Sequence, residues 1–338
     1  MQSLPANLGA FTKAVQLAIQ NNFNELIGTT GNVVYLDPVN GNDLNDGLSA
    51  VVVAPGSGQG PVKTLAAGYA ILRAGKNDIL VLISDGTTAS SARLSAGFTW
   101  AKSAAHFIGM CSPTMFSQRA RVAPTAGVTG FANFFTVSGN GCYFKNIEFF
   151  QGFTVGIAAE ICMTVSGSRN VFENCHICGM ADTDAGGGAD TGSRNLKLAG
   201  GQENLFLNCV IGDDTTARSV ANASVEFSGG AARNVFDSCI FPVLATAATV
   251  LGVKALTGGI DRFNLFRDCQ FINAINSTGV SMTGLGSIGA NGGGPNGIIV
   301  YKKCTIVGAA EWEQTTKTSV YVDGPTPNSG TGIAVNPA

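Results

Sequence analysis

The second half of the chain alternates apolar and polar positions in six similar segments. Each segment has two short β-rich runs around a polar kink, and no helical pattern of ten residues lies beside them. The segments read CYFKNIEF, NVFENCHI, NLFLNCVI, NVFDSCIF, NLFRDCQF and IVYKKCTI, from residue 142 to residue 306. Internal repeats of this length predict a solenoid, in which each unit buries its apolar face against the next.

The repeat length is nearly constant. Aligned on the cysteine, with Ile147 in its place in the first segment, the steps are 28 (147 to 175), 34 (175 to 209), 30 (209 to 239), 30 (239 to 269) and 35 (269 to 304) residues. Leucine-rich and propeller repeats need other signatures. We therefore predict an all-β fold, a single-stranded parallel β-helix over residues 32–307, whose coils stack about 4.8 Å apart. The variation in step length then belongs to the loops.

Stacking predicts ladders of equivalent side chains. Stacked amides can bond from coil to coil, stacked rings pack, and free cysteines pack as small apolar groups. The predicted ladders are Asn170, Asn204, Asn234 and Asn264; Phe172, Phe206, Phe236 and Phe266; and Cys175, Cys209, Cys239, Cys269 and Cys304. A further asparagine ladder, at Asn146, Asn174 and Asn208, marks the polar kink, where asparagine tolerates a left-handed backbone.

The two ends of the chain fall outside the repeat. Residues 1–31 form a predicted docking segment, with an amphipathic helix over residues 7–27 whose apolar stripe is Leu8, Phe11, Val15, Ile19, Phe23 and Leu26. This stripe either caps the first coil or contacts another subunit or a larger assembly. Residues 308–338 are predicted to contain a strand at 319–322, followed by an extended arm rich in proline, glycine and asparagine.

Composition narrows the range of partners. Lys+Arg is 20 and Asp+Glu is 22, so the net charge is −2, and there is no basic surplus for nucleic acid. Charged residues make up only 12% of the 338 residues, and glycine numbers 45. Because few charges cover the surface and the apolar stripe needs a partner, we expect a homo-oligomer, with a trimer favoured.

No membrane or export segment is apparent. The longest apolar stretch, residues 239–253, contains Pro242 and is shorter than the roughly 20 residues of a spanning helix. The first residues, MQSLPANLGAFTK, lack the basic and apolar regions of a signal peptide. The 9 cysteines are therefore expected to be reduced thiols of a protein made in cytosol.

The segment before the repeats resembles a known family. The stretches VYLDPVNGNDLNDGLSA, GPVKTLAAGYAIL and NDILVLISDGTT lie between residues 34 and 88. They are similar to the opening of right-handed parallel β-helix proteins of the pectate-lyase-like superfamily. The matching residues are Tyr35, Pro38, Gly41, Asp43, Asp46, Gly47, Pro61, Lys63, Thr64 and Leu65. The resemblance implies the fold, a right-handed coil. It does not select a function, because the superfamily includes lyases, hydrolases, phage tailspikes and non-catalytic virion proteins.

Catalytic candidates are acidic. Glycan-cleaving β-helices need carboxyl groups on two sides of a bond, and the candidates here are Asp182, Asp184, Asp213 and Asp214, with Asp190 nearby. The alternative is that these residues form turns in solvated loops. The arginine-centred catalytic strand of the lyases has no match, since Arg169, Arg194, Arg233 and Arg262 sit near turns without an acidic cluster. We therefore predict no catalytic site.

Metal and cofactor sites are not expected. Asp37, Asp43 and Asp46 could hold calcium, although their spacing also suits turns. Cys175, His176 and Cys178 lie close in sequence, but alternation along a strand sends Cys175 and His176 to opposite faces. His106 has no carboxylate near it in sequence and is interpreted as structural.

These features predict a non-catalytic structural protein of a bacteriophage virion, made in the host cytoplasm. We expect it at the capsid surface or head, where the major capsid protein would be a partner. A tailspike or tail-fibre receptor-binding protein that cleaves polysaccharide is the alternative, and a free polysaccharide lyase or hydrolase is a second one. No nucleic acid, membrane or cofactor is expected as a partner.

Overall fold

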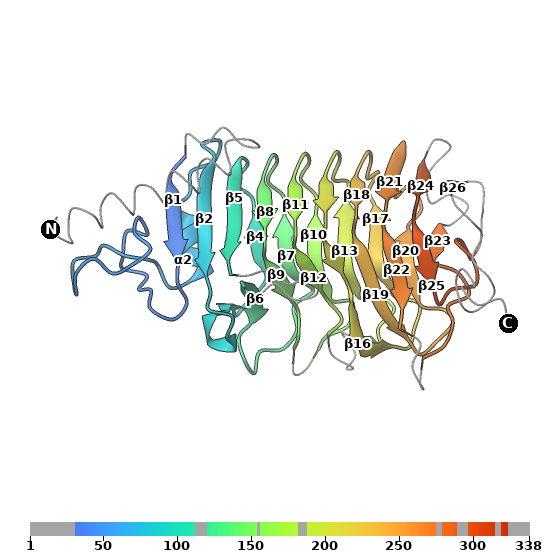
Figure 1. Cartoon of the computed structure of the whole chain (residues 1–338), viewed down its shortest axis with the longest axis horizontal. Coiled ribbons are helices and arrows are strands. Elements are labelled where there is room, and N and C mark those ends of the chain that lie inside the picture. The colour runs from blue at the N-terminus through green and yellow to red at the C-terminus, as the bar shows by residue number, and fades with distance from the viewer. Residues whose placement is uncertain are drawn as a thin grey trace, which may run out of the picture.

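The chain folds into a right-handed parallel β-helix with very little α-helix. The computed structural model describes residues 31–111, 120–153, 156–181, 188–274, 279–288, 297–314 and 319–323. Its strands lie side by side along one axis, from β1 at the N-terminal end to β26 at the other (Figure 1). The fold predicted from the repeats is therefore present, whereas the predicted helix over residues 7–27 lies outside the described residues.

Three parallel sheets, here called A, B and C, form the walls of the helix. Each coil contributes a strand to A, then to B, then to C. Sheet A contains β1 (Val33–Leu36), β2 (Asp78–Ile83), β5 (Ala105–Met110), β8 (Tyr143–Lys145), β11 (Val171–Glu173), β14 (Leu205–Leu207), β18 (Val235–Asp237), β21 (Phe263–Arg267), β24 (Ile298–Lys302) and β26 (Val320–Asp323).

Sheet B contains β3 (Ala92–Leu94), β6 (Arg121–Pro124), β9 (Glu148–Phe150), β12 (His176–Cys178), β15 (Val210–Ile211), β16 (Asp213–Arg218), β19 (Ile240–Ala245), β22 (Gln270–Asn273) and β25 (Thr305–Val307). Sheet C contains β4 (Phe98–Trp100), β7 (Asn133–Val137), β10 (Ile161–Val165), β13 (Arg194–Ala199), β17 (Ala223–Ser228), β20 (Leu251–Ala255) and β23 (Gly286–Ile288). A 3-10 turn, η1 (Thr88–Ser90), precedes β3.

The polar kink of each repeat is the corner between sheets A and B. Asn146, Asn174 and Asn208 each occupy this corner with φ of 55°, 50° and 52°. Ser238 and Asp268 take the same conformation in the next two coils. Asparagine and its short polar relatives adopt this left-handed region more readily than other side chains. One such residue turns the chain sharply and lets sheet B begin at once.

The asparagine ladder stands at the corner between sheets C and A. Asn204 Nδ2 donates to Asn234 Oδ1 at 2.9 Å, and Asn234 Nδ2 donates to Asn264 Oδ1 at 2.9 Å. The same two oxygens also accept the backbone N–H of the preceding ladder residue, Asn204 N at 3.0 Å and Asn234 N at 3.1 Å. These side chains are buried, so the ladder pairs polar groups that would otherwise lose water without replacement.

The aromatic ladder fills the interior behind sheet A. Ring centroids of Phe172, Phe206, Phe236 and Phe266 follow one another at 4.7, 4.7 and 4.5 Å, with interplanar angles of 3°, 8° and 7°. Phe144 precedes them and Tyr301 continues the stack. These rings are fully buried.

The cysteine column lies beside the rings and also makes hydrogen bonds. Cys209 Sγ donates to Phe172 O at 3.3 Å, and Cys239 Sγ donates to Phe206 O at 3.3 Å, each one coil back. Burial raises the pKa of the Cys175 and Cys209 thiols well above the ordinary value. The Cys175 and Cys209 thiols therefore stay protonated, as the donation by Cys209 requires, and no disulfide joins the cysteines of the described residues.

The two ends of the β-helix differ in the element that lies there. The helix α2 (Leu65–Ile71) packs on β1, and its first turn is capped by Thr64 Oγ1, which accepts Ala67 N–H at 3.2 Å. At the other end the coil continues past residue 307, because β26 pairs in parallel with β24. The strand predicted at 319–322 is thus observed one residue later, as part of sheet A, and residues beyond 323 lie outside the described part.

Candidate functional site on the outer face of sheet C

A row of polar side chains runs along the outer face of sheet C. Side chains alternate across a strand, and the neighbours of this row, such as Leu196, Leu198 and Val225, are in the core. Strand pairing places the row in register, with one member on each strand: Thr99, Thr136, Thr164, Lys197, Glu226, Lys254 and Ser287. Neighbouring members are therefore about 4.8 Å apart at the backbone.

Glu226 is the acidic centre of this row and is almost fully buried. Its Oε2 accepts Arg194 Nε at 2.7 Å and lies 2.6 Å from Arg194 Nη2. Its Oε1 lies 3.3 Å from Lys197 Nζ. Lys254 is the register partner of Glu226 on the following strand. One carboxylate is thus surrounded by three cationic side chains.

Arg194 is held in place by the loop before it. Its Nη1 donates to the carbonyl oxygens of Thr191 at 2.8 Å and Ser193 at 2.6 Å. The side chain is buried, and these bonds fix the plane of the guanidinium against Glu226. Arg194 therefore begins β13 as a rigid support of the row.

Arg218 adds a second buried cation beside this group. It donates to Asn222 Oδ1 at 2.7 Å, Ser224 Oγ at 2.9 Å and Leu251 O at 2.7 Å, which are all neutral acceptors. Burial, together with the charge of Arg194, lowers the pKa of Arg218 to about 9. The guanidinium is still mostly charged at neutral pH, so its charge adds to that of Arg194 nearby.

Lys254 is the half-buried cation whose ammonium group is available. Burial, and then the charge of Arg194, lower the pKa of its ammonium group. Within the described residues, no ion pair or hydrogen bond holds its Nζ. The cluster of Arg194, Lys197, Arg218, Glu226 and Lys254 therefore carries four positive charges and one negative charge, in a chain whose net charge is −2.

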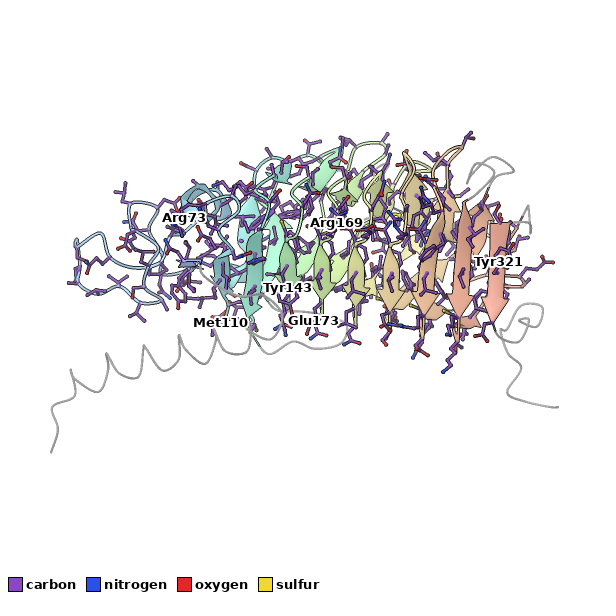
Figure 2. All side chains as sticks on the ribbon, turned by 90° about the horizontal axis from the view of Figure 1, so that it is seen from above. Arg73, Met110, Tyr143, Arg169, Glu173 and Tyr321 are labelled. Carbon is purple, nitrogen blue, oxygen red and sulfur yellow. The ribbon has the colours of Figure 1, made fainter. Side chains whose placement is uncertain are left out.

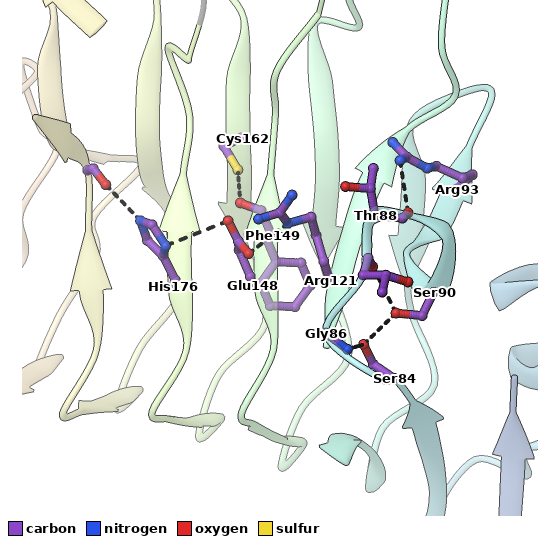
Figure 3. A network of polar contacts seen from close by, with 12 residues as sticks. Ser84, Gly86, Thr88, Ser90, Arg93, Arg121, Glu148, Phe149, Cys162 and His176 are labelled. Atoms are coloured by element: carbon purple, nitrogen blue, oxygen red, sulfur yellow. Dashed lines mark hydrogen bonds and ion pairs between the residues drawn. The ribbon is translucent and has the colours of Figure 1, made fainter. Parts of the chain in front are cut away.

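A second polar group lies on the outer face of sheet B (Figure 3). Glu148 Oε2 accepts Arg121 Nε at 2.7 Å, and Glu148 Oε1 lies 3.9 Å from His176 Nδ1. His176 Nε2 bonds Gly212 O at 2.9 Å and so carries a proton, because a carbonyl oxygen only accepts. This network borders a cavity of about 260 Å³ lined by His176, Gly212, Asp213, Asp214, Thr215 and Pro242.

The acidic candidates among the described residues do not form a pair across this cavity. Asp213 and Asp214 are consecutive residues of β16, and Asp213 Oδ1 accepts Thr215 N and Oγ1 at 2.7 and 2.6 Å. Carboxyl groups that cleave a glycosidic bond flank it from two sides. Asp190 Oδ1 likewise accepts Gly192 N at 2.7 Å within a turn. Asp182 and Asp184 lie outside the described residues.

Asp37 and Asp46 of the calcium candidates serve local turns, whereas Asp43 bonds the segment before α2. Asp37 Oδ1 accepts Val39 N and Asn40 N, each at 2.9 Å. Asp43 Oδ1 accepts Thr64 N at 2.8 Å, and Asp46 Oδ1 accepts Leu48 N at 3.0 Å. Over the described residues, no group of three histidine, cysteine or acidic side chains is placed to hold a metal ion, the Cys175–Cys178 region included.

His106 lies on the outer face of sheet A and is buried. Tyr143 N donates to its Nδ1 at 3.1 Å, and its Nε2 lies 3.3 Å from Asn77 Oδ1. Burial lowers the pKa of His106 to about 4. The imidazole therefore links three neighbouring segments of the chain as a neutral group.

The predicted interaction stripe, Leu8 to Leu26, lies outside the described residues. No helix in the described part of the chain is long and apolar enough to cross a membrane.

Sequence reasoning missed the cluster on sheet C. The register of this row is hidden, because Lys197, Glu226 and Lys254 precede the next ladder asparagine by 7 (197 to 204), 8 (226 to 234) and 10 (254 to 264) residues. Loops of unequal length also separate the row from the cysteines before it. The sequence placed Arg194 near a turn, and the residue does follow one, at the start of β13. One sequence pattern could have identified the row. In the strand before each ladder asparagine, a polar residue stands between two apolar residues, and these polar residues are the members of the row.

Comparison with known proteins gives structural matches alone. No protein-family profile and no curated protein sequence matches the chain. A pectate lyase, Pel9A, matches with a TM-score of 0.52 and 16% identity, over 82% of this chain and 64% of the lyase. A pectin methylesterase from Aspergillus niger matches with a TM-score of 0.50 and 14% identity, over 82% of this chain and 83% of the esterase.

A tailspike domain of bacteriophage CBA120 is a weaker match, with a TM-score of 0.36 and 9% identity over 84% of this chain and 47% of the domain. At these identities the pectate lyase and pectin methylesterase matches show a shared fold. The fold that they share with this chain is a right-handed parallel β-helix of the pectate lyase and pectin methylesterase type.

Proposed function

We propose that this protein binds an acidic polysaccharide along the outer face of sheet C, as the receptor-binding protein of a bacteriophage virion. The observation that carries the proposal is the cluster around Glu226, where Arg194 and Lys197 pair with the carboxylate and Lys254 is its register partner. Arg218 adds a further positive charge close to Arg194. Cleavage of the bound chain is a separate activity, tested separately below.

The charge excess suits an anionic ligand. A buried carboxylate needs one good partner, and Arg194 supplies it through two nitrogen atoms at 2.7 and 2.6 Å. Lys197, Lys254 and Arg218 then remain beyond what Glu226 requires. Charged groups are costly to bury or crowd unless they are paired. An anionic group bound near Lys197 and Lys254 would lower this cost.

The row also suits a polymer. Three threonine hydroxyls, at positions 99, 136 and 164, precede the charged part, and Ser287 follows it, so hydroxyl and charged groups follow one line for seven strands. A polysaccharide is an extended chain of hydroxyl groups, and an acidic one repeats its carboxylates. The rigid coil keeps the protein groups in place without ordering them on binding, which favours affinity.

The shared fold agrees with this proposal without establishing it. The pectate lyase and pectin methylesterase that share the fold act, by their names, on polysaccharides. A second candidate, the non-catalytic capsid protein, is favoured by one observation. The loop between β1 and α2 exposes a group of apolar side chains, which suits docking on another protein: Leu44, Leu48, Val51, Val52 and Val53.

The test is binding of polygalacturonate to the purified protein, measured by affinity electrophoresis with neutral dextran as the comparison polymer. We expect retardation by the acidic polymer alone. Lys254→Ala and Lys197→Ala should each weaken binding about 10- to 100-fold, because each removes a charge-assisted contact of about 1.5–3 kcal/mol. Lys302→Ala removes a lysine of sheet A and is the matched control, which should bind as the wild type does.

Equal retardation of the wild type, the Lys197 variant and the Lys254 variant would contradict the site, and a lack of binding to acidic polymers would contradict the function. Cleavage is followed in the same samples by the length of the polymer. If the wild type shortens it, the lowered pKa of Lys254 makes this lysine the first candidate for a proton acceptor. Lys254→Arg would then keep binding and lose cleavage.

A further inference from the structure

An apolar stripe runs along the outer face of sheet A, and the buried His106 interrupts it on β5. Over the first strands the stripe belongs to a buried cluster that contains Ile79 and Tyr143. From β11 onward its members are only half-buried, and the last is 55% exposed. They lie in register on successive strands: Val171, Leu205, Val235, Leu265, Val300 and Tyr321.

Charged side chains border the stripe on both sides (Figure 2). At the start of the strands, Arg169 and Arg233 pair with Glu203 at 2.8 and 3.0 Å. At the end of the strands, Glu173 lies 2.9 Å from Lys145, and Asp237 pairs with Arg267. An apolar centre with a charged rim is the usual anatomy of a protein–protein interface.

We propose that this face joins two copies of the chain, which pack side by side and point in the same direction. A two-fold axis parallel to the β-helix and lying in the interface brings each member of the stripe against its own copy. The same rotation places the start edge of one copy opposite the end edge of the other, at the same height along the axis.

The charges of the two edges match in this orientation. Arg169 of one copy faces Glu173 of the other, and both are on the coil of β11. Two coils further along the axis, on the coil of β18, Arg233 of one copy faces Asp237 of the other in the same way. The symmetry repeats both pairs. In the last coils the basic Arg267 faces Phe263, an exposed ring that can accept a cation on its face.

The opposite orientation fits less well. An axis parallel to the strands would bring the end edge of one copy onto the end edge of the other in reverse order. Asp237 would then face Arg267, but Glu173 would face Asp323 twice, and the two pairs that the parallel arrangement forms at Arg169 and Arg233 would be lost. Like charges placed together disfavour an association. The edges therefore select the parallel arrangement.

The area suits a specific but modest association. The free part of the face spans six strands and three rows of side chains, about 25 Å by 20 Å from standard strand dimensions. This is roughly 500 Å² on each copy, or about 1,000 Å² in total, near the lower limit of specific interfaces. The pairing leaves sheet C of each copy uncovered.

The first test is the mass of the full chain by sedimentation velocity over a range of concentrations. We expect a reversible dimer for the wild type and a monomer for Leu265→Glu, which places a charge in the stripe. Val307→Glu changes an exposed valine of sheet B and is the matched control, which should dimerise normally. A wild type that is monomeric at every concentration, or a Leu265→Glu variant that dimerises normally, would overturn the proposal.

The second test fixes the orientation with a short bismaleimide crosslinker. The background is Cys111→Ser, since the other cysteines are buried. The parallel pair predicts that Val300→Cys crosslinks with its own copy. The reversed pair predicts crosslinks only between Val300→Cys and Leu205→Cys chains. Crosslinks of this second kind would overturn the parallel arrangement. If the protein is a monomer and Val300→Cys is still protected from a monofunctional maleimide, another part of the same chain covers the stripe, and this result would overturn the interface.

Discussion

Replacement of Asn234 by leucine is expected to destabilise the β-helix strongly. The side chain is fully buried in the middle of the asparagine ladder. Its Oδ1 accepts both Asn204 N and Asn204 Nδ2, and its Nδ2 donates to Gly201 O and Asn264 Oδ1. Leucine has about the same length but neither donor nor acceptor, so four hydrogen bonds are lost at once.

The expected cost follows from the groups left behind. A buried polar group without a partner costs about 1–3 kcal/mol. Gly201 O and Asn264 Oδ1 can regain part of this through other contacts, whereas Asn204 N and Asn204 Nδ2 lose the same acceptor together. We therefore expect a loss of about 3–5 kcal/mol in the free energy of unfolding, a large share of the roughly 5–15 kcal/mol of a folded domain.

The assay is urea unfolding followed by circular dichroism, with the melting temperature as a second readout. Asn32→Leu is the matched control, because its side chain is exposed and makes no hydrogen bond within the described residues. It should change the unfolding free energy by less than about 0.5 kcal/mol. An Asn234→Leu protein as stable as the control would refute the ladder as a source of stability.

Three further outcomes are expected. Phe236→Ala should cost about 3–5 kcal/mol in urea unfolding, since it empties a position between two stacked rings at 4.7 and 4.5 Å; an unchanged midpoint would speak against the aromatic stack. Stability should fall by on the order of 3 kcal/mol as the pH drops from about 6.5 to about 4, because the unfolded state protonates His106 and the folded state, with its pKa of about 4, does not. His106→Asn should remove most of this pH dependence, and an unchanged pH dependence in the variant would show that another group causes it. Polysaccharide binding should weaken steeply with added salt, because it depends on Lys197 and Lys254; salt-independent binding would exclude a charge-based site.

The stacked residues of the interior could be predicted from the sequence, because they recur at the same positions of each repeat. Asn204, Phe206 and Cys209 recur at fixed offsets within each segment, and a parallel coil stacks residues at equal offsets. The left-handed corner at Asn208 follows from the same offsets. These positions are separated by strands of constant length, so their register could be counted along the chain.

The register of the charged residues on sheet C could not be derived from the sequence in this way. Between the segment of Cys209 and the strand of Glu226 lies a loop whose length differs from coil to coil, and the same is true before Lys197 and Lys254. Only strand pairing shows that these three residues share one row. Asp213 was a catalytic candidate because of its charge, although its carboxylate bonds Thr215 within its own segment.

The most direct test of the proposed function is a crystal structure of the protein with a bound acidic oligosaccharide. The account predicts that the sugar chain lies along sheet C, with a carboxylate in contact with the ammonium groups of Lys197 and Lys254 and with hydroxyls near Thr164 and Ser287. An oligosaccharide bound in the cavity beside His176 and Asp213, or on another face, would contradict it.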